Sequence, residues 1–264
     1  MDWLSALALG MVQGLTELLP VSSSGHLVLV EKALGLELSD LSFEVSVHVA
    51  TALGLCLVLG KELRMMFRSV VPSGLSEGER VQGRSLILNV FVATLPAVAV
   101  GLLASEPLRA VFHDPVLTFA MLPVTGALLV ATRWAPGDGR ILNPRLALLI
   151  GAAQAVAILP GISRSGFTIA AALLLGVRKD EAVKFSFLLS LPAIVGGTAL
   201  ELSRGLSSAS SAGAGALAVG SVAALVSAVV AAGALLRVVR RGKLEYFGYY
   251  CLCVGALGLA LSLR

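Results

Sequence analysis

Two short segments of the sequence place serines beside a carboxylate or an arginine in otherwise apolar surroundings. They read Gln13-Gly-Leu-Thr-Glu17-Leu-Leu-Pro20-Val-Ser22-Ser23-Ser24-Gly-His26 and Gln154-Ala-Val-Ala-Ile-Leu-Pro160-Gly161-Ile-Ser163-Arg164-Ser165-Gly-Phe-Thr168. A shift of 141 positions aligns Gln13 with Gln154, Ser22 with Ser163 and Ser24 with Ser165. In both segments a proline interrupts an apolar run and hydroxylated residues follow. This repeated pattern predicts two broken helices that meet around one polar site.

The residues after each break are suited to binding a phosphate-like anion. Proline stops the incoming half-helix, and serine is a favoured N-cap for the helix that follows. The start of that helix presents unpaired N–H groups and the positive end of its dipole, which attract anions. Arg164 adds a planar, charged donor that matches phosphate oxygens. The candidate substrate-binding residues are Gln13, Ser22, Ser24, Gly161, Ser163, Ser165 and Thr168.

Glu17, Ser23, His26 and Arg164 are the candidate catalytic residues. Gln13 and Glu17 share one helix face, and a carboxylate beside an anion is useful if it holds a divalent cation or moves protons. We therefore expect Gln13 and Glu17 to hold Mg²⁺, or Ca²⁺, with Ser23 as nucleophile and His26 as acid or base. His48 is interpreted as structural or at the rim of the site, and His113 is interpreted as solvated. The alternative is that the small residues only allow close packing and that Arg164 reaches an interface.

The composition places the chain in a membrane. Hydrophobic residues make up 57% of the sequence, charged residues only 14%, and the mean hydropathy is +0.92. A soluble domain of 264 residues would carry more charge on its wet surface. The net charge of +4 does not indicate nucleic-acid binding, because the basic residues lie in short loops. Six segments are long enough to span a bilayer, near 43–60, 86–104, 115–133, 183–203, 214–236 and 246–263.

The two repeat segments, about 2–34 and 146–177, are too broken for straight spans, and we interpret them as re-entrant hairpins. The alternative is that both cross fully and give eight or more spans. With hairpins, fifteen basic residues lie on one face: Lys61, Arg64, Arg68, Arg80, Arg84, Arg133, Arg140, Arg145, Arg178, Lys179, Lys184, Arg237, Arg240, Arg241 and Lys243. Only Lys32, Arg109, Arg204 and Arg264 lie on the other. The positive-inside rule makes the first face cytoplasmic and both termini periplasmic.

This topology predicts an all-α integral membrane protein with an inverted internal repeat in a single membrane domain, residues 1–264. The repeat units cover about 1–140 and 141–264. Each unit is one hairpin plus three spans, and three is odd. The second unit is therefore inverted relative to the first, and the hairpins enter from opposite faces. We also expect the face formed by Gly220, Ala224, Ala228 and Ala232 to pack closely against another helix.

The two motifs resemble the signatures of a known family. The segment from Gln13 to His26 resembles the (Glu/Gln)-x-x-x-Glu signature of the undecaprenyl-diphosphate phosphatases, the bacitracin-resistance family. The segment from Pro160 to Thr168 is similar to that family's Pro-Gly-x-Ser-Arg-Ser-x-x-Thr signature at every fixed position. The resemblance covers the whole chain. Its functional positions correspond to Glu17, Ser23, His26, Ser163, Arg164, Ser165 and Thr168.

The resemblance implies a hydrolase of the bacterial inner membrane that removes the terminal phosphate from undecaprenyl diphosphate. The monophosphate is reused in peptidoglycan synthesis, and the activity confers resistance to bacitracin, which sequesters the diphosphate. Many members have Glu where this chain has Gln13, which leaves one carboxylate at this motif. A lipid-phosphate flippase is the alternative function, because inverted repeats with broken helices are typical of transporters. The expected partners are a polyprenyl diphosphate and membrane lipids but no nucleic acid. Whether the chain forms a homodimer is left open.

Overall fold

The computed structural model describes residues 1–35, 41–71, 74–104, 114–136, 139–203 and 213–262. Arg109, His113, Arg204 and Arg264, discussed above, lie outside these residues. The described residues form helices and one isolated bridge between Arg140 and Val177. The helices are α1 (Trp3–Leu18), α2 (Ser23–Leu34), α3 (Leu41–Val58), α4 (Gly60–Val70), α5 (Glu77–Leu103), α7 (Pro115–Ala131), η1 (Thr132–Trp134), α8 (Pro144–Val156), α9 (Arg164–Leu174), α10 (Lys179–Ser203), α11 (Ala214–Arg240) and α12 (Glu245–Ser262).

Five of the described helices are long and apolar enough to cross a membrane: α3, α5, α7 with η1, α10 and α11. The sixth predicted span, 246–263, forms α12, which is 18 residues long. Its first turns contain Glu245, Tyr246, Tyr249 and Tyr250, which lower its hydropathy below that of the other five. The all-α membrane fold predicted from the sequence is confirmed.

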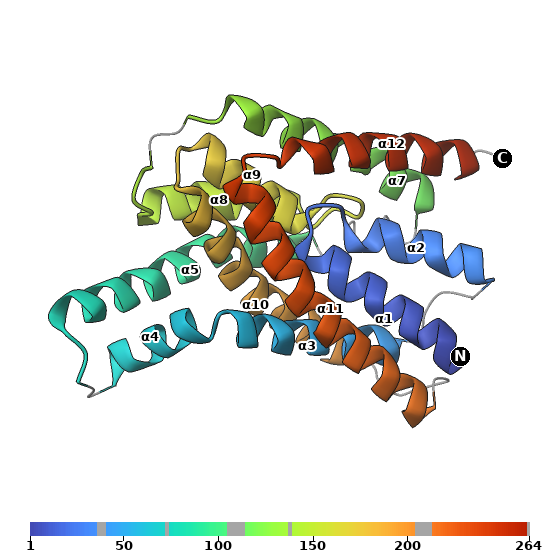
Figure 1. Cartoon of the computed structure of the whole chain (residues 1–264), viewed down its shortest axis with the longest axis horizontal. Helices are drawn as coiled ribbons and strands as arrows, with labels where there is room; N and C mark the ends of the chain where they lie inside the picture. The colour runs from blue at the N-terminus through green and yellow to red at the C-terminus, as the bar shows by residue number, and fades with distance from the viewer. Residues whose placement is uncertain (36–40, 72–73, 105–113, 137–138, 204–212, 263–264) are drawn as a thin grey trace.

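The two repeat segments form helical hairpins that enter from opposite ends of the molecule (Figure 1). Helix α1 begins and α2 ends toward the end of the molecule that holds both termini, whereas α8 begins and α9 ends toward the other end. At about 1.5 Å per residue, α2 is about 18 Å long and α9 about 17 Å, well short of a bilayer core of about 30 Å. Helices this short support re-entrant hairpins rather than complete crossings.

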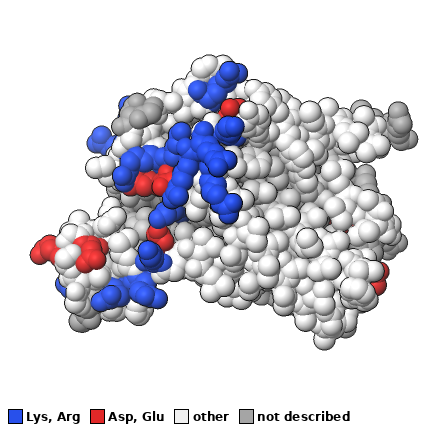
Figure 2. Space-filling model, viewed as in Figure 1, with Lys and Arg blue, Asp and Glu red and all other residues white. Residues whose placement is uncertain are grey.

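The basic side chains gather at the end of the molecule opposite the termini. Figure 2 shows them over the α4–α5 hairpin and over the ends of α10 and α11, while most of the remaining visible surface carries no charge. The same end was assigned to the cytoplasm from the loop charges. The basic residues are therefore concentrated at one end of the long axis of the molecule, as predicted.

The predicted spans 43–60 and 86–104 leave residues 61–84 between them as a loop, and this prediction was wrong, because most of these residues are helical. Helix α4 covers Gly60–Val70, and α5 begins at Glu77, ahead of the predicted span. The cause is a capping box: the Ser76 hydroxyl accepts a hydrogen bond from the Glu79 backbone N–H (3.3 Å), and the Glu79 carboxylate accepts one from the Ser76 N–H (3.0 Å). These bonds satisfy the first donors of α5, so the helix extends into the charged segment.

Helices α1 and α11 pack with their backbones in close contact, as the small-residue face predicts. Gly220, Ala224, Ala228 and Ala232 are buried along α11. Gly10 of α1 lies against the Gly220 carbonyl, and Gly14 lies against the Ala224 carbonyl, with no room for a Cβ atom at either glycine. This contact holds α1, and hence the first hairpin, at a fixed height along a membrane-spanning helix.

The contact between α1 and α11 gives a first prediction. Gly14→Val should lower the free energy of unfolding by about 2 kcal/mol or more, because the new side chain overlaps the Ala224 carbonyl and the Ser227 hydroxyl. Gly101→Ala is the matched control, since a Cβ at this helical position faces open space and should stabilise α5 by about 0.5–1 kcal/mol. Thermal unfolding of the purified protein in detergent measures both changes. An unchanged Tm for Gly14→Val would show that close packing is not needed.

Candidate active site

A polar cavity of about 310 Å³ lies where the tips of the two hairpins meet. Helices α3, α5 and α10 complete its walls. The lining residues are Thr16, Glu17, Ser22, Ser23, Ser24, His48, Ala97, Gln154, Ala157, Ile158, Leu159, Pro160, Ile162, Ser163, Arg164 and Ala193. The structure thus brings together two segments that are far apart in the sequence, as the repeat predicted.

The first hairpin turns sharply so that its serines enter the cavity. Leu19 leaves α1 in an extended conformation, and α2 begins again at Ser23. Between them, Ser22 has a φ of 68°, in the left-handed region that residues other than glycine rarely adopt. Such strained residues cluster at functional sites, where the surrounding structure holds them. Here the strain places three consecutive serines in the cavity wall.

The second hairpin turns at Gly161, which has a φ of +83° and lies against the Thr118 carbonyl. A Cβ at this position would overlap that carbonyl, so the close approach needs glycine. Ser163 then caps α9, because its hydroxyl accepts a hydrogen bond from the Gly166 N–H (3.1 Å). Helices α2 and α9 therefore both begin at the cavity, and their N-terminal dipoles favour an anion there.

Glu17 and Arg164 form an ion pair that joins the two hairpin tips. The Arg164 Nη2 group donates to Glu17 Oε1. The other carboxylate oxygen of Glu17 accepts hydrogen bonds from the Ser23 hydroxyl (2.7 Å) and from Gln13 Nε2 (3.2 Å). Only 9% of the Glu17 side chain is exposed. The predicted nucleophile, Ser23, is therefore in direct contact with a carboxylate that can accept its proton.

Arg164 keeps donors that the protein does not use. Its Nη1 group donates to the Ser190 carbonyl at 3.4 Å, but its Nε group is buried without a hydrogen-bond partner among the described residues. Gln154, which is 2% exposed, has neither its amide oxygen nor its amide nitrogen paired among those residues. Buried polar groups normally have partners. Both side chains line the cavity, so both can bind an anionic ligand there.

The remaining predicted residues hold the two tips together. The Gly161 N–H donates to Ser24 Oγ (3.2 Å), and the Ser165 hydroxyl donates to the Leu19 carbonyl (3.1 Å). Thr168 does not line the cavity, because its hydroxyl contacts the Arg164 carbonyl (2.8 Å) and the Ser186 hydroxyl (2.6 Å). Gly161, Ser165 and Thr168 therefore shape the site without lining it.

His26 lies outside the cavity, away from the ion pair. Its Nδ1 atom is 2.8 Å from the Ser22 carbonyl and its Nε2 atom is 2.7 Å from the Tyr250 hydroxyl. The imidazole also stacks on the Tyr250 ring, with centroids 5.5 Å apart. Both ring nitrogens are thus engaged, and His26 fixes the strained turn against α12. Its predicted role in proton transfer stays a prediction.

Two residues that sequence reasoning did not select lie in the cavity wall. His48 Nε2 is 4.0 Å from Glu17 Oε2, and His48 Nδ1 is 2.8 Å from the Glu44 carbonyl one turn earlier. The carbonyl accepts a hydrogen bond from the Nδ1–H group, which turns the Nε2 atom toward the carboxylate. An ionisable residue within an apolar span was the available signal for His48. For Gln154, the signal was its alignment with Gln13.

The cavity contains few protein ligands for a metal. Within the described residues, no group of three or more His, Cys, Asp and Glu side chains could hold a metal ion. The Oε1 atom of Gln13 is nevertheless buried without a partner beside Glu17, so one carboxylate and one amide oxygen are present. Mg²⁺ often takes only one or two carboxylates from the protein, together with phosphate oxygens and water. The residues fit a cation that arrives with a diphosphate.

Comparisons with known proteins found a matching family and similar proteins of about the same length. The family described as "Bacitracin resistance protein BacA" matches residues 6–257. A protein named undecaprenyl-diphosphatase from Salinibacter ruber is 41% identical over 272 residues, which cover 99% of this chain and 100% of that protein. Proteins of the same name from Korarchaeum cryptofilum and Christiangramia forsetii are 40% and 42% identical, again over 99% of this chain, and over 100% and 99% of their own lengths.

The ion pair gives a second prediction, which concerns stability. Arg164→Ala leaves the buried Glu17 carboxylate without its cation, and should lower the free energy of unfolding by about 3–5 kcal/mol. Glu17→Ala should have a similar effect. The double variant should lose clearly less than the sum of the two, because it leaves no isolated charge. Thermal unfolding of the four proteins in one detergent measures the coupling. Additive effects would mean that the pair does not hold the tips together.

Proposed function

The chain belongs to the bacitracin resistance protein BacA family, and we propose that it hydrolyses undecaprenyl diphosphate to undecaprenyl phosphate and inorganic phosphate. The relatives named undecaprenyl-diphosphatase cover the full chain, which supports this activity. The observation that carries the proposal is the contact of Ser23 with Glu17, which is itself paired to Arg164, at the start of two helices. A nucleophile, a base and an anion-binding group thus meet within one cavity.

Arg164 binds the terminal phosphate in this proposal. The unpaired Nε group and the N-terminal ends of α2 and α9 all favour an anion in the cavity. A phosphate competes with Glu17 for the guanidinium. As the guanidinium turns toward the phosphate, Glu17 becomes a stronger base for the Ser23 proton, which is already hydrogen-bonded to it. Substrate binding and activation of the nucleophile are therefore linked through one ion pair.

Ser23 attacks the terminal phosphorus while Glu17 takes its proton. The bond between that phosphorus and the bridging oxygen breaks, and undecaprenyl phosphate leaves. Water then hydrolyses the phosphoserine and releases inorganic phosphate, with Glu17 returning the proton to Ser23. The serine N–H groups at the helix ends and Arg164 stabilise the charge on the transferring phosphoryl group.

We assign the protonation of the leaving phosphate oxygen, and the later removal of a proton from the attacking water, to His48 rather than to His26. His48 lines the cavity at 4.0 Å from Glu17, whereas both ring nitrogens of His26 are engaged outside it. His48 also supplies a second ionisable group beside Glu17. Gln13 cannot do so, because its amide does not ionise. In this assignment His26 is a positioning residue that holds the Ser22 turn.

A divalent cation, Mg²⁺ or Ca²⁺, held by Glu17 and the Gln13 amide oxygen would neutralise charge on the diphosphate when bound. We propose that the protein lies in the bacterial inner membrane with its basic end in the cytoplasm and both termini in the periplasm. The distribution of basic residues supports this orientation. The product would re-enter peptidoglycan synthesis, and loss of free diphosphate would confer bacitracin resistance. The relatives' names do not favour the flippase alternative.

The activity itself is the third prediction. The purified protein in detergent with a polyprenyl diphosphate and Mg²⁺ should release phosphate, which a pure transporter would not do. Arg164→Ala and Glu17→Ala should each lower kcat/KM by about 10²-fold or more, because each removes charge stabilisation or the base. Arg164→Lys should not restore activity, since a point charge does not replace the planar fork.

The control for this experiment is Arg241→Ala, which removes a basic residue that does not line the cavity. It should release phosphate at the wild-type rate. Near wild-type release by folded Arg164→Ala and Glu17→Ala proteins would reject the assignment of the site. Retained activity in Ser23→Ala alone would remove only its role as nucleophile.

The fourth prediction separates His48 from Gln13. His48→Gln should lower kcat/KM by about 10²-fold and remove one limb of the pH–rate profile, because it removes an ionisable group from the cavity. Gln13→Glu introduced into that variant should restore part of the activity, since it returns a second ionisable group beside Glu17. Gln13→Glu alone is the control. If His48→Gln keeps the wild-type rate and pH profile, His48 transfers no proton.

A further inference from the structure

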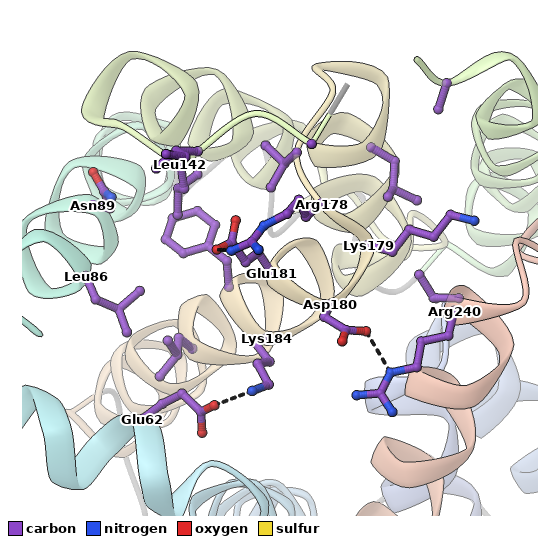
Figure 3. A pocket seen from close by; sticks show the side chains of 18 of the residues that line it. Glu62, Leu86, Asn89, Leu142, Arg178, Lys179, Asp180, Glu181, Lys184 and Arg240 are labelled. Atoms are coloured by element: carbon purple, nitrogen blue, oxygen red, sulfur yellow. Dashed lines mark hydrogen bonds and ion pairs between the residues drawn. The ribbon is translucent and has the colours of Figure 1, made fainter. Parts of the chain in front are cut away.

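A second and larger cavity, about 1070 Å³, lies at the basic end of the molecule. It is enclosed by the α4–α5 hairpin, the segment after α7, the start of α10 and the end of α11, as Figure 3 shows in part. It shares no lining residue with the cavity at the hairpin tips. The proposed phosphatase chemistry therefore makes no use of it.

The rim of this cavity carries more positive than negative charge. Each of its carboxylates pairs with a cation: Glu62 accepts from Lys184 (2.6 Å), Asp180 accepts from Arg240 (2.7 Å) and Glu181 Oε1 accepts from Arg178. The other carboxylate oxygen, Glu181 Oε2, is buried without a hydrogen-bond partner among the described residues. Two further cations, Arg133 and Lys179, also line it, and neither pairs with a carboxylate in the part of the chain that the structure describes. The residues that line the cavity therefore carry a net charge of +2, which favours an anionic ligand.

The fixed ion pairs leave Lys179 free to meet a ligand. Its Nζ atom lies close to Gly242, where a Cβ would come within 3.0 Å of it. Gly242 has a φ of +68° just beyond the end of α11. Arg133 stacks over the Trp134 ring at 5.5 Å from its centroid, which orients its guanidinium. The surplus cations are therefore placed by the fold.

Below the rim the walls are apolar, with a single unpaired amide. Leu86, Leu142, Leu173, Phe185 and Leu188 line this part. Asn89 lines it as well, is only 2% exposed, and its Oδ1 atom has no hydrogen-bond partner among the described residues. A buried amide without a partner is unfavourable unless a ligand or solvent satisfies it. The unpaired atom is an acceptor, so its partner has to be a donor.

We propose that this cavity binds an anionic glycerophospholipid from the leaflet at the basic end. The phosphate pairs with Lys179 and Arg133 at the rim, and the apolar walls contact the acyl chains. Charged rims above apolar walls between membrane helices are suited to lipid head groups. A free phosphate ion would leave the apolar walls without contacts, so the lipid fits better.

Native mass spectrometry of the full-length protein in detergent tests this site. Added phosphatidylglycerol should bind at least about five-fold more tightly than zwitterionic phosphatidylcholine, because two surplus cations favour a lipid with a net negative charge, and the choline cation of phosphatidylcholine cancels the charge of its phosphate. The Arg133→Ala/Lys179→Ala double variant should bind both lipids equally. Arg241→Ala, which removes a charge from the same end but outside the cavity, should keep the preference.

Three results would overturn the proposal. The first is equal binding of the two lipids by the wild-type protein. The second is an unchanged preference in the double variant, with the single Lys179→Gln variant measured in its place if the double variant does not fold. The third is displacement of phosphatidylglycerol by millimolar inorganic phosphate, which would show a site for a free anion. Phosphate release by the double variant should match the wild type, since neither residue lies near the hairpin tips.

Discussion

The ion pair between Glu17 and Arg164 is the contact on which the arrangement of this protein depends. An isolated charge within a bilayer costs several kcal/mol, so each side chain requires the other. Glu17 is carried by a hairpin that enters from one end of the molecule, and Arg164 by a hairpin that enters from the opposite end (Figure 1). Pairing the charges therefore brings both hairpin tips to the same depth. The same pairing assembles the candidate active site.

Several polar groups at and beside the cavity lack partners in the described part of the chain. Among the described residues, Arg164 Nε, Gln13 Oε1 and both amide atoms of Gln154 are buried without a hydrogen-bond partner, and Ser22 has a left-handed backbone conformation. Each of these features costs stability. The backbone contact between α1 and α11 offsets that cost by fixing α1 against a long helix. Packing in one part of the molecule thus supports polar groups that are kept available for an anion.

Most of the fold could be predicted from patterns that act locally or repeat. The proline–serine repeat predicted both hairpins, and the spacing of Gly220, Ala224, Ala228 and Ala232 predicted a packing face. Residues 61–84 were misjudged, because their charges suggest a loop whereas Ser76 and Glu79 cap a helix. That capping box was visible in the sequence.

The candidate site was predicted less completely, because side-chain direction depends on tertiary contacts. His26 follows the serines in sequence, yet it turns toward Tyr250, which is 224 residues away. His48 belongs to a different helix from the motif and reaches Glu17 only because α3 packs beside α1. Thr168 fits the family signature, but one helical turn directs it toward Ser186 and away from the cavity. The spacing of residues within the two motifs does not determine where these three side chains point.

The separation of 147 residues between Glu17 and Arg164 has a consequence for biosynthesis. The ribosome delivers the carboxylate well before its cation exists, so the first hairpin reaches the membrane with an uncompensated acid at its tip. Until the second half emerges, that tip has to stay hydrated or protonated, and it cannot settle at its final depth. Insertion of this protein is therefore completed from its C-terminal half, with the later hairpin drawing the earlier one into place.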